Sequence, residues 1–238
     1  IEYYIKKYDV KEFHFEDLNP TVNETRTIEL CNEIIKRDLN ITWKIVAGTK
    51  VESIKKTSTV ELMAKAGCEY ISISPESGSM KIMKKIGKPF DINHAYKIVK
   101  SMNKNKIFSQ ACFVLGYPGE NKDDLKFTKN MIMNLTKNGI DEIAIFIITP
   151  IPGAEIFDEI GGYNNLSELN FSPNWRQDYS YLSKKRLEFY LLFLLYKFFY
   201  YPLKIFKQIF NFLTRRFQTK MEMVPYKYLK LSFLTMKS

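Results

Sequence analysis

The chain has 238 residues, of which 45% are hydrophobic, so it can bury a sizeable core and is too apolar to be disordered. Its formal net charge is +10, but residues 1–182 carry 24 basic and 24 acidic side chains, whereas residues 183–238 carry 12 and 2. The excess charge therefore lies in the tail, which argues against a nucleic-acid groove across the body. The three cysteines, Cys31, Cys68 and Cys112, are far apart and predict reduced thiols in a cytosolic protein.

Strand-like and helix-like segments alternate from residue 10 to residue 153. Hydrophobic runs predict strands at 10–17, 41–50, 69–77, 107–120 and 141–153. Amphipathic segments between them predict helices at 24–39, 58–68, 80–87, 91–105 and 123–139, with Ser58 or Thr59 and Asp91 as N-caps. Because the strands are almost continuously apolar, they indicate an α/β fold with a parallel sheet covered by helices.

Polar residues gather where each predicted strand ends, as they do at the functional face of a (β/α) barrel. A flavodoxin-like or Rossmann sheet is the rival architecture, but "FEDLNP" after the first strand lacks the glycines of a phosphate loop. We therefore expect a partial (β/α) barrel over residues 1–160, a linker at 161–182 and a separate tail at 183–238. No CxxC or CxxxCxxC spacing occurs, and the two histidines stand alone, so the sequence predicts no metal site.

Several of these strand ends resemble those of radical S-adenosylmethionine enzymes. "ISISPESGSMKIMKK" resembles the Glu-Ser-Gly-Ser segment after their fourth strand, and "FVLGYPGENKDDL" resembles the Gly-x-Pro-Gly-Glu turn after their fifth. "FHFEDLNPT", "GTKVESI" and "ITPIPGAEIF" are similar to the turns after the second, third and sixth strands, with Lys50 and Ala154 in place of the usual Arg and Thr. The matches follow the family's order and imply five of six barrel units.

The resemblance implies S-adenosylmethionine as cofactor, contacted by Glu76 and Ser77 after the third predicted strand and by Gly116 and Tyr117 after the fourth. Glu16, Asp17 and Lys50 follow the first two predicted strands, and the resemblance suggests that they contact the methionine end of the cofactor or the substrate. Ordinary structural roles stay open for all of them: Ser77 or Ser79 as a helix cap, Glu76 and the Glu16–Asp17 pair as solvated carboxylates, and Lys50 as a surface lysine.

The family's 4Fe–4S cluster is held by a CxxxCxxC motif that this chain lacks. Because the chain also begins at Ile1 rather than Met and carries no signal peptide, we expect a C-terminal fragment whose cluster ligands lie upstream. The tail resembles, more loosely, the helix that follows the barrel in the cobalamin-binding branch. This implies a cobalamin domain preceding the chain and radical-based modification, such as methylation, of a small-molecule or lipid-like substrate.

The tail itself predicts helices rich in aromatic and basic residues. Residues 183–217 hold 12 aromatics, Pro202 interrupts an apolar stretch too short to span a bilayer, and Leu203, Phe206, Phe210, Leu213 and Phe217 form an apolar stripe. Either these helices pack on the barrel, or they contact a membrane surface peripherally through 183–217. Two hypotheses thus remain: part of a cytoplasmic, membrane-associated radical enzyme, or a non-catalytic binding scaffold with a membrane-facing tail.

Overall fold

The computed structural model describes residues 1–161, 163, 165, 167, 169 and 172–235, with side chains to residue 231. In these residues a short helix α1 (Glu2–Tyr8) precedes five strands: β1 (Glu12–Phe15), β2 (Thr42–Thr49), β3 (Cys68–Glu76), β4 (Phe108–Leu115) and β5 (Glu142–Ile147). All neighbouring strands pair in parallel, in the order β1-β2-β3-β4-β5. The predicted α/β class and the parallel arrangement of five strands are confirmed.

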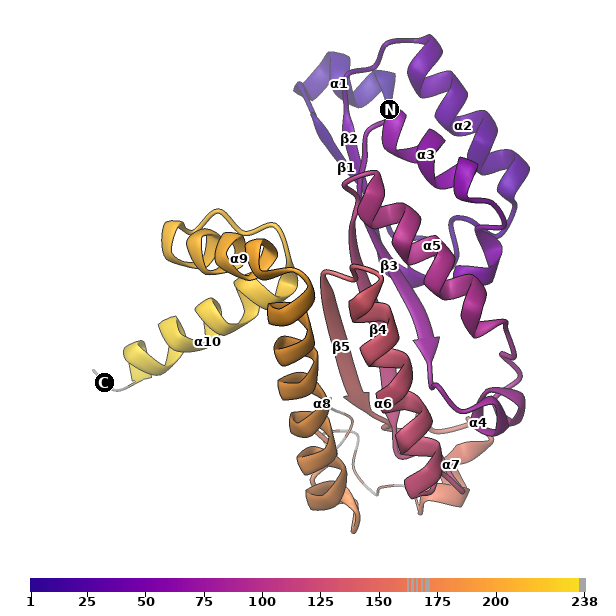
Figure 1. Ribbon diagram of the computed structural model, residues 1–238, viewed down its shortest axis with the longest axis vertical. Coiled ribbons are helices and arrows are strands. Elements are labelled where there is room, and N and C mark those ends of the chain that lie inside the picture. The colour runs from indigo at the N-terminus through magenta and orange to yellow at the C-terminus, as the bar shows by residue number, and fades with distance from the viewer. Residues whose placement is uncertain (162, 164, 166, 168, 170–171, 236–238) are drawn as a thin grey trace.

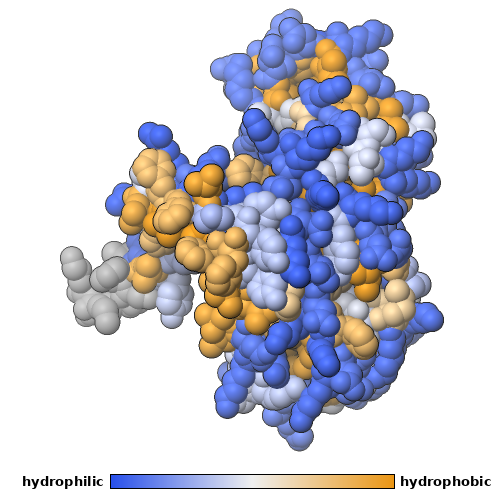
Figure 2. All heavy atoms as spheres, viewed as in Figure 1, coloured by the Kyte–Doolittle hydropathy of each residue, from blue (hydrophilic) through white to orange (hydrophobic). Residues whose placement is uncertain are grey.

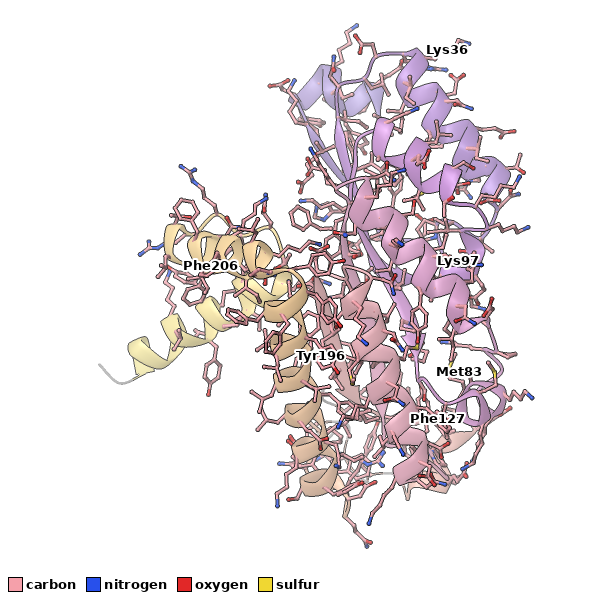
Figure 3. All side chains as sticks on the ribbon, in the orientation of Figure 1. Lys36, Met83, Lys97, Phe127, Tyr196 and Phe206 are labelled. Atoms are coloured by element: carbon pink, nitrogen blue, oxygen red, sulfur yellow. The ribbon has the colours of Figure 1, made fainter. Side chains whose placement is uncertain are left out.

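The helices between the strands cover one face of the sheet (Figure 1). They are α2 (Glu24–Lys36), η1 (Val51–Ser53), α3 (Thr57–Lys65), α4 (Met80–Lys85), α5 (Ile92–Lys104) and α6 (Lys122–Lys137). On the covered face Ile71, Ile73 and Phe113 are completely buried, while Lys36 and Lys97 project from the outer side of the helices (Figure 3). This apolar layer between sheet and helices is the core of the fold.

The start of α3 differs from the sequence-based expectation. Neither Ser58 nor Thr59 caps it, because the helix already begins at Thr57. The Glu24 carboxylate of α2 instead binds the segment that leads into α3, accepting hydrogen bonds from the Lys55 and Lys56 amides at 2.8 and 3.0 Å. Asp91 and Ser79, in contrast, cap α5 and α4 with their own side chains, as expected.

The tail consists of α8 (Tyr179–Tyr200), α9 (Pro202–Thr214) and α10 (Lys220–Thr235), after a short α7 (Ile156–Ile160). Helix α8 lies against α6 and the free edge of β5, where the Tyr190 hydroxyl accepts a hydrogen bond from the Ile145 amide at 3.0 Å. At Pro202 the chain turns through 115°, so α9 leaves the sheet (Figure 1). No single helix in the described residues is long and apolar enough to cross a membrane; α8 and α9 meet both requirements only together, as a bent pair.

Candidate functional site

The face of the sheet opposite helices α2 to α6 carries a row of polar side chains, most of them buried. They alternate along β3 and continue across β4 and β5: Tyr70, Ser72, Ser74, Glu76, Gln110, Cys112 and Glu142. The Tyr70 hydroxyl and the Gln110 amide both donate to one oxygen of Glu142, at 2.5 and 3.0 Å. Burial raises the pKa of the Glu142 carboxyl, whereas the Tyr70 hydrogen bond opposes this rise. Sequence reasoning missed this network, although the alternation in "EYISISPE" was its signal.

Glu76 ends this row at the C-terminal tip of β3. Its backbone adopts φ 60°, a left-handed conformation that costs a non-glycine residue about 1–2 kcal/mol. The side chain is mostly buried and receives an ion pair from Lys88, with 2.7 Å between Nζ and Oε1. Burial raises the pKa of Tyr117, and the carboxylates of Glu76 and Glu120 raise it further. Two of the sequence-predicted residues, Glu76 and Tyr117, are thus brought together.

The turn after β4 holds a second shielded carboxylate, that of Glu120. One of its oxygens accepts a hydrogen bond from the Gly116 amide at 2.6 Å, while Oε1 is shielded from solvent and has no partner among the described residues. Burial raises the pKa of Glu120 to about 7, and the nearby Asp124 carboxylate adds to the rise. The turn therefore offers a shielded carboxyl oxygen as a free hydrogen-bonding group.

Arg176 fixes this turn from a segment that the sequence marked only as a linker. Its guanidinium donates to the Gly116 carbonyl at the end of β4 and to the Ile148 carbonyl at the end of β5, both at 3.0 Å. It also pairs with Asp178, and its side chain is only 7% exposed. A pocket lies beside it, lined by the Gly116–Glu120 turn, α7 and Trp175–Asp178. Its partners are 28 and 60 residues away in sequence, so no local pattern indicates this role.

Ser77 and Gly78 point elsewhere, toward α6. The Ser77 hydroxyl is completely buried and lies 3.1 Å from that of Thr128, which also accepts a hydrogen bond from the Gly78 amide. A Cβ on Gly78 would lie 2.4 Å from the Phe127 carbonyl oxygen. The glycine therefore serves close packing of the turn onto α6, and Ser79 is the residue that caps α4.

Glu16, Asp17 and Lys50 lie after β1 and β2 and are all exposed. No hydrogen bond among the described residues links their side chains to Glu76 or Tyr117. Between them the structure places a compact hydroxyl–amide cluster, in which Thr21 lies 2.6 Å from Thr49 and 2.5 Å from Ser53. A cofactor contact by these three residues stays a prediction.

All three cysteines of the chain are free thiols. Cys31 and Cys68 are buried, and burial raises the pKa of both thiols as well as that of Cys112. The described residues contain no group of three or more His, Cys, Asp or Glu side chains that could hold a metal ion. A thiolate-ligated cluster does not fit cysteines with these properties.

Comparison with known proteins places the chain in a family. The profile of the Radical SAM superfamily matches residues 1–132. The chain is 29% identical to an anaerobic magnesium-protoporphyrin IX monomethyl ester cyclase of Rubrivivax gelatinosus over 68% of its length and 28% of the cyclase. It is 28% identical to an uncharacterized methyltransferase of Pyrococcus horikoshii over 72% of its length and 35% of that protein.

Solved structures share the fold. The cobalamin- and [4Fe-4S]-bound methyltransferase TsrM of Kitasatospora setae superimposes with a TM-score of 0.56 at 15% identity, covering 66% of this chain and 29% of TsrM. Coproporphyrinogen III oxidase of Escherichia coli does so with a TM-score of 0.52 at 14% identity, covering 74% and 41%. The chain spans about a third of the curated relatives it matches. With its family profile matched over more than half of its length, the chain belongs to the Radical SAM superfamily.

Proposed function

We propose that this chain forms the S-adenosylmethionine-binding part of a radical enzyme that modifies its substrate, with methylation as the favoured reaction. Three of the related proteins are named as methyltransferases, and two as cyclases of a porphyrin ester. The observation that carries the proposal is Glu76, a mostly buried carboxylate held on strained backbone at the strand tip. Strain of this kind persists where the surrounding structure enforces it, often at ligand sites.

The residues at this tip suit S-adenosylmethionine. The Glu76 carboxylate can accept hydrogen bonds from ribose hydroxyls or an amino group, and Glu120 Oε1 lacks a partner within the described residues. The Tyr117 ring and the Gly116 backbone lie in the adjoining turn, where they would meet an adenine. Bound there, the cofactor would supply an activated methyl group or the source of an adenosyl radical, while Glu76 and Tyr117 would orient it.

The other cofactors of the proposal fit this chain less well. An iron–sulfur cluster does not fit the described residues, whose buried thiols have raised pKa values and stand apart. In the proposed enzyme both groups would be held by residues other than those described, in line with relatives of which this chain matches only about a third.

The test uses the whole protein that the gene encodes. Glu76→Gln keeps the size of the side chain and removes its charge. We expect S-adenosylmethionine affinity to fall by about 1–3 kcal/mol in calorimetry, the usual cost of leaving a buried partner unsatisfied. Glu69→Gln, on the same strand but exposed, is the matched control. Equal affinity of wild type and Glu76→Gln, with unchanged thermal unfolding, would remove Glu76 from the site.

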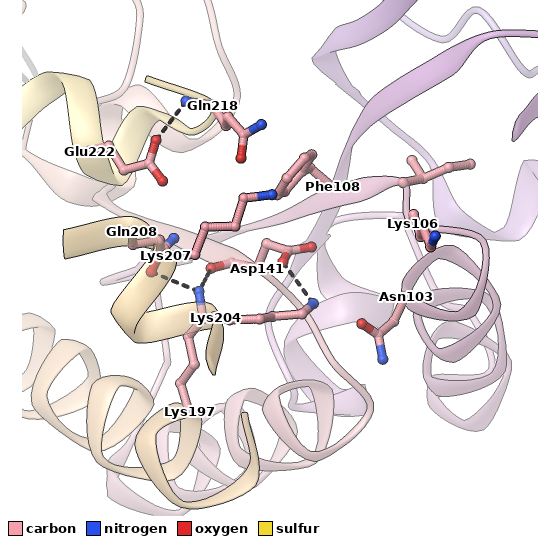
Figure 4. A pocket seen from close by; sticks show the side chains of 11 residues that line it. Asn103, Lys106, Phe108, Asp141, Lys197, Lys204, Lys207, Gln208, Gln218 and Glu222 are labelled. Carbon is pink, nitrogen blue, oxygen red and sulfur yellow. Dashed lines mark hydrogen bonds and ion pairs between the residues drawn. The ribbon is translucent and has the colours of Figure 1, made fainter. Parts of the chain in front are cut away.

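A second function is supported by a specific observation on α9, and we propose it as well: peripheral attachment to an anionic membrane. On an ordinary surface helix the polar residues face water, whereas on α9 the apolar residues do. Its apolar residues face outward, with Leu203 80%, Phe206 60%, Phe210 57% and Leu213 72% exposed. On its inner side Asn211 is buried and Lys204 reaches Asp141 (Figure 4).

The neighbouring face of α8 extends this surface with Leu187, Leu191, Leu195 and Phe199, all at least half exposed. Figure 2 shows the hydrophobic residues gathered over α8 to α10. An exposed apolar surface of this extent marks an interaction site.

The charge of the tail supports an anionic membrane as the occupant of this surface. The two acidic residues of 183–238 both have partners: the part-exposed Glu188 pairs with Lys129 and Lys185, and Glu222 is buried with its oxygens bonded to Asn211, Gln218 and Thr219. The exposed charges of the tail are thus basic, including Arg215, Arg216, Lys227 and Lys230. Basic and apolar side chains together suit the headgroup region of anionic bilayers.

Flotation with vesicles tests the attachment. We expect the chain to float with phosphatidylglycerol vesicles and less with phosphatidylcholine ones, and to dissociate as salt rises. Phe206→Ser with Phe210→Ser should abolish flotation, whereas Tyr228→Ser on α10 should not. Equal flotation of both variants, or no flotation of the wild type, would refute the proposed membrane attachment. Loss of flotation when the preceding segment of the protein is present would assign the surface to that segment instead.

A further inference from the structure

A second pocket lies at the end of the sheet opposite Glu76 (Figure 4). It measures about 240 Å³ and opens between the N-terminal ends of β4 and β5, the turn after α5, and helices α8 to α10. Four lysines line it: Lys106, Lys197, Lys204 and Lys207. Neither proposed function uses this pocket.

Only one of these lysines is neutralised by a carboxylate among the described residues. Lys204 pairs with Asp141 Oδ1 at 2.7 Å, and the other oxygen of Asp141 accepts the Ser109 amide and hydroxyl. The second carboxylate on the wall, that of Glu222, is occupied by neutral donors: the Asn211 side chain and the Gln218 and Thr219 amides. The charges of Lys106, Lys197 and Lys207 therefore remain uncompensated by any ion pair the structure describes.

Lys197 is the most unusual of the four because its side chain is completely buried. Its ammonium group donates to the Asp141 carbonyl oxygen and to Gln208 Oε1, the latter at 2.9 Å. Both acceptors are neutral, so these two hydrogen bonds leave one N–H and the charge of the ammonium group without a direct partner. Burial lowers the pKa of Lys197 to about 8; the nearby Asp141, Glu142 and Glu222 carboxylates oppose this shift and the Lys204 ammonium adds to it. A buried charge without a direct ion pair is costly, and an anionic ligand in the pocket would offset part of that cost.

The remaining lysines and the amides complete the cationic wall. The Lys207 ammonium lies over the Phe108 ring, 5.3 Å from its centroid, and Lys106 stands across the pocket in the turn before β4. The amides of Asn103 and Gln218 line the pocket too and can donate hydrogen bonds. Ammonium and amide donors from several elements thus surround one small volume, an arrangement that suits a group with several acceptor oxygens and a double negative charge.

We propose that this pocket binds a phosphate monoester group, held by Lys197, Lys207 and Lys106. The pocket exceeds the size of a phosphate group, so the attached alcohol also has room. Beyond Gln208 and Glu222, which belong to both walls, an apolar groove begins, lined by residues such as Phe198, Ile209 and Phe212. The same chemistry is found in a soluble phosphate ester and in the headgroup of phosphatidic acid.

The first experiment titrates the chain with glycerol 1-phosphate by calorimetry, against sodium chloride at equal ionic strength. Lys207→Gln removes one cation at the pocket mouth, and Lys227→Gln removes an exposed cation of α10 outside the pocket. We expect affinity to fall about tenfold for the first and to stay unchanged for the second, in line with losing one charge-assisted hydrogen bond. Lys197→Met, which keeps the buried stem, should abolish binding; if it does not fold, Lys207→Gln decides.

The second experiment separates the two sources of phosphate. Vesicles with phosphatidic acid are compared with phosphatidylglycerol vesicles of equal surface charge, for wild type and Lys207→Gln. A preference for phosphatidic acid that Lys207→Gln removes assigns the pocket to a lipid headgroup, whereas binding of glycerol 1-phosphate alone assigns it to a soluble ester. The proposal is overturned if neither probe binds better than its control, or if Lys207→Gln and Lys227→Gln weaken binding alike.

Discussion

Replacing Arg176 by methionine tests how the ends of β4 and β5 are joined. Methionine keeps the apolar stem and removes the guanidinium, which donates to the Gly116 and Ile148 carbonyls at 3.0 Å each. Each such bond from a charged donor contributes about 1.5 kcal/mol net, and the pair with the half-exposed Asp178 adds at most about 1 kcal/mol. We expect the free energy of unfolding to drop by about 3–4 kcal/mol.

Urea denaturation followed by circular dichroism measures this loss. Asp178→Asn is the matched control, because it removes the ion pair and leaves both bonds to the carbonyls in place. It should cost less than about 1 kcal/mol. If Asp178→Asn destabilises the protein as much as Arg176→Met, the surface ion pair rather than the strand-end bonds carries the stability, and the reasoning is refuted.

Three further predictions concern the titration of Glu120, the packing of two glycines and the assembly of an iron–sulfur cluster. Because Glu120 has its pKa raised from 4.5 to about 7, the unfolded state binds fewer protons between these pH values, so stability falls as pH rises through this window; Glu120→Gln should gain about 3 kcal/mol over wild type at pH 8 and nothing at pH 4, by urea titration. Gly78→Ala should cost about 3 kcal/mol through the clash with the Phe127 carbonyl, and Gly87→Ala, whose Cβ meets no atom within 4 Å, about 1 kcal/mol; the reverse order in thermal melts contradicts the packing argument. Anaerobic reconstitution of this chain should yield no 4Fe–4S cluster, and about four irons per chain, lost on mutating a cysteine, would disprove this.

Local patterns were sufficient for most of the fold. The strands are runs rich in β-branched apolar residues, and these runs mark their positions in the sequence. Because such runs are typical of strands buried under helices, they also predict the parallel pairing. Asp91, Ser79 and the Pro202 break act on residues next to them in the chain, and the structure has them where the sequence placed them. The predicted strand at 141–153 was too long, because β5 ends at Ile147, before the Pro150–Gly153 turn.

Features that depend on distant residues were missed. Glu24 binds the Lys55 amide across 31 residues, Arg176 reaches Gly116 across 60, and Gly78 meets α6 across 50. The two partners of each contact lie far apart in the sequence, so secondary-structure propensity and local residue spacing do not predict that they meet. The site follows the same rule: Glu76 and Tyr117 came from matched turns, whereas the Tyr70–Gln110–Glu142 network needs three strands in register.

The orientation of α9 could not be predicted from the sequence either. It determines both the exposed apolar surface and the lining of the lysine-rich pocket. The sequence specifies a helix with an apolar stripe and a basic face, but an amphipathic helix can turn either face to the protein. Here the polar face turns inward because it finds partners there: Lys204 reaches Asp141, Gln208 accepts from Lys197, and Asn211 donates to Glu222. That choice leaves the phenylalanines outside, which is costly in water and favourable at an acyl boundary. The inward-facing residues of α9 also line the proposed phosphate pocket. One orientation of the helix therefore accounts for both the lysine-lined pocket and the exposed apolar surface. Substitutions on the outer stripe and in the pocket should therefore act separately.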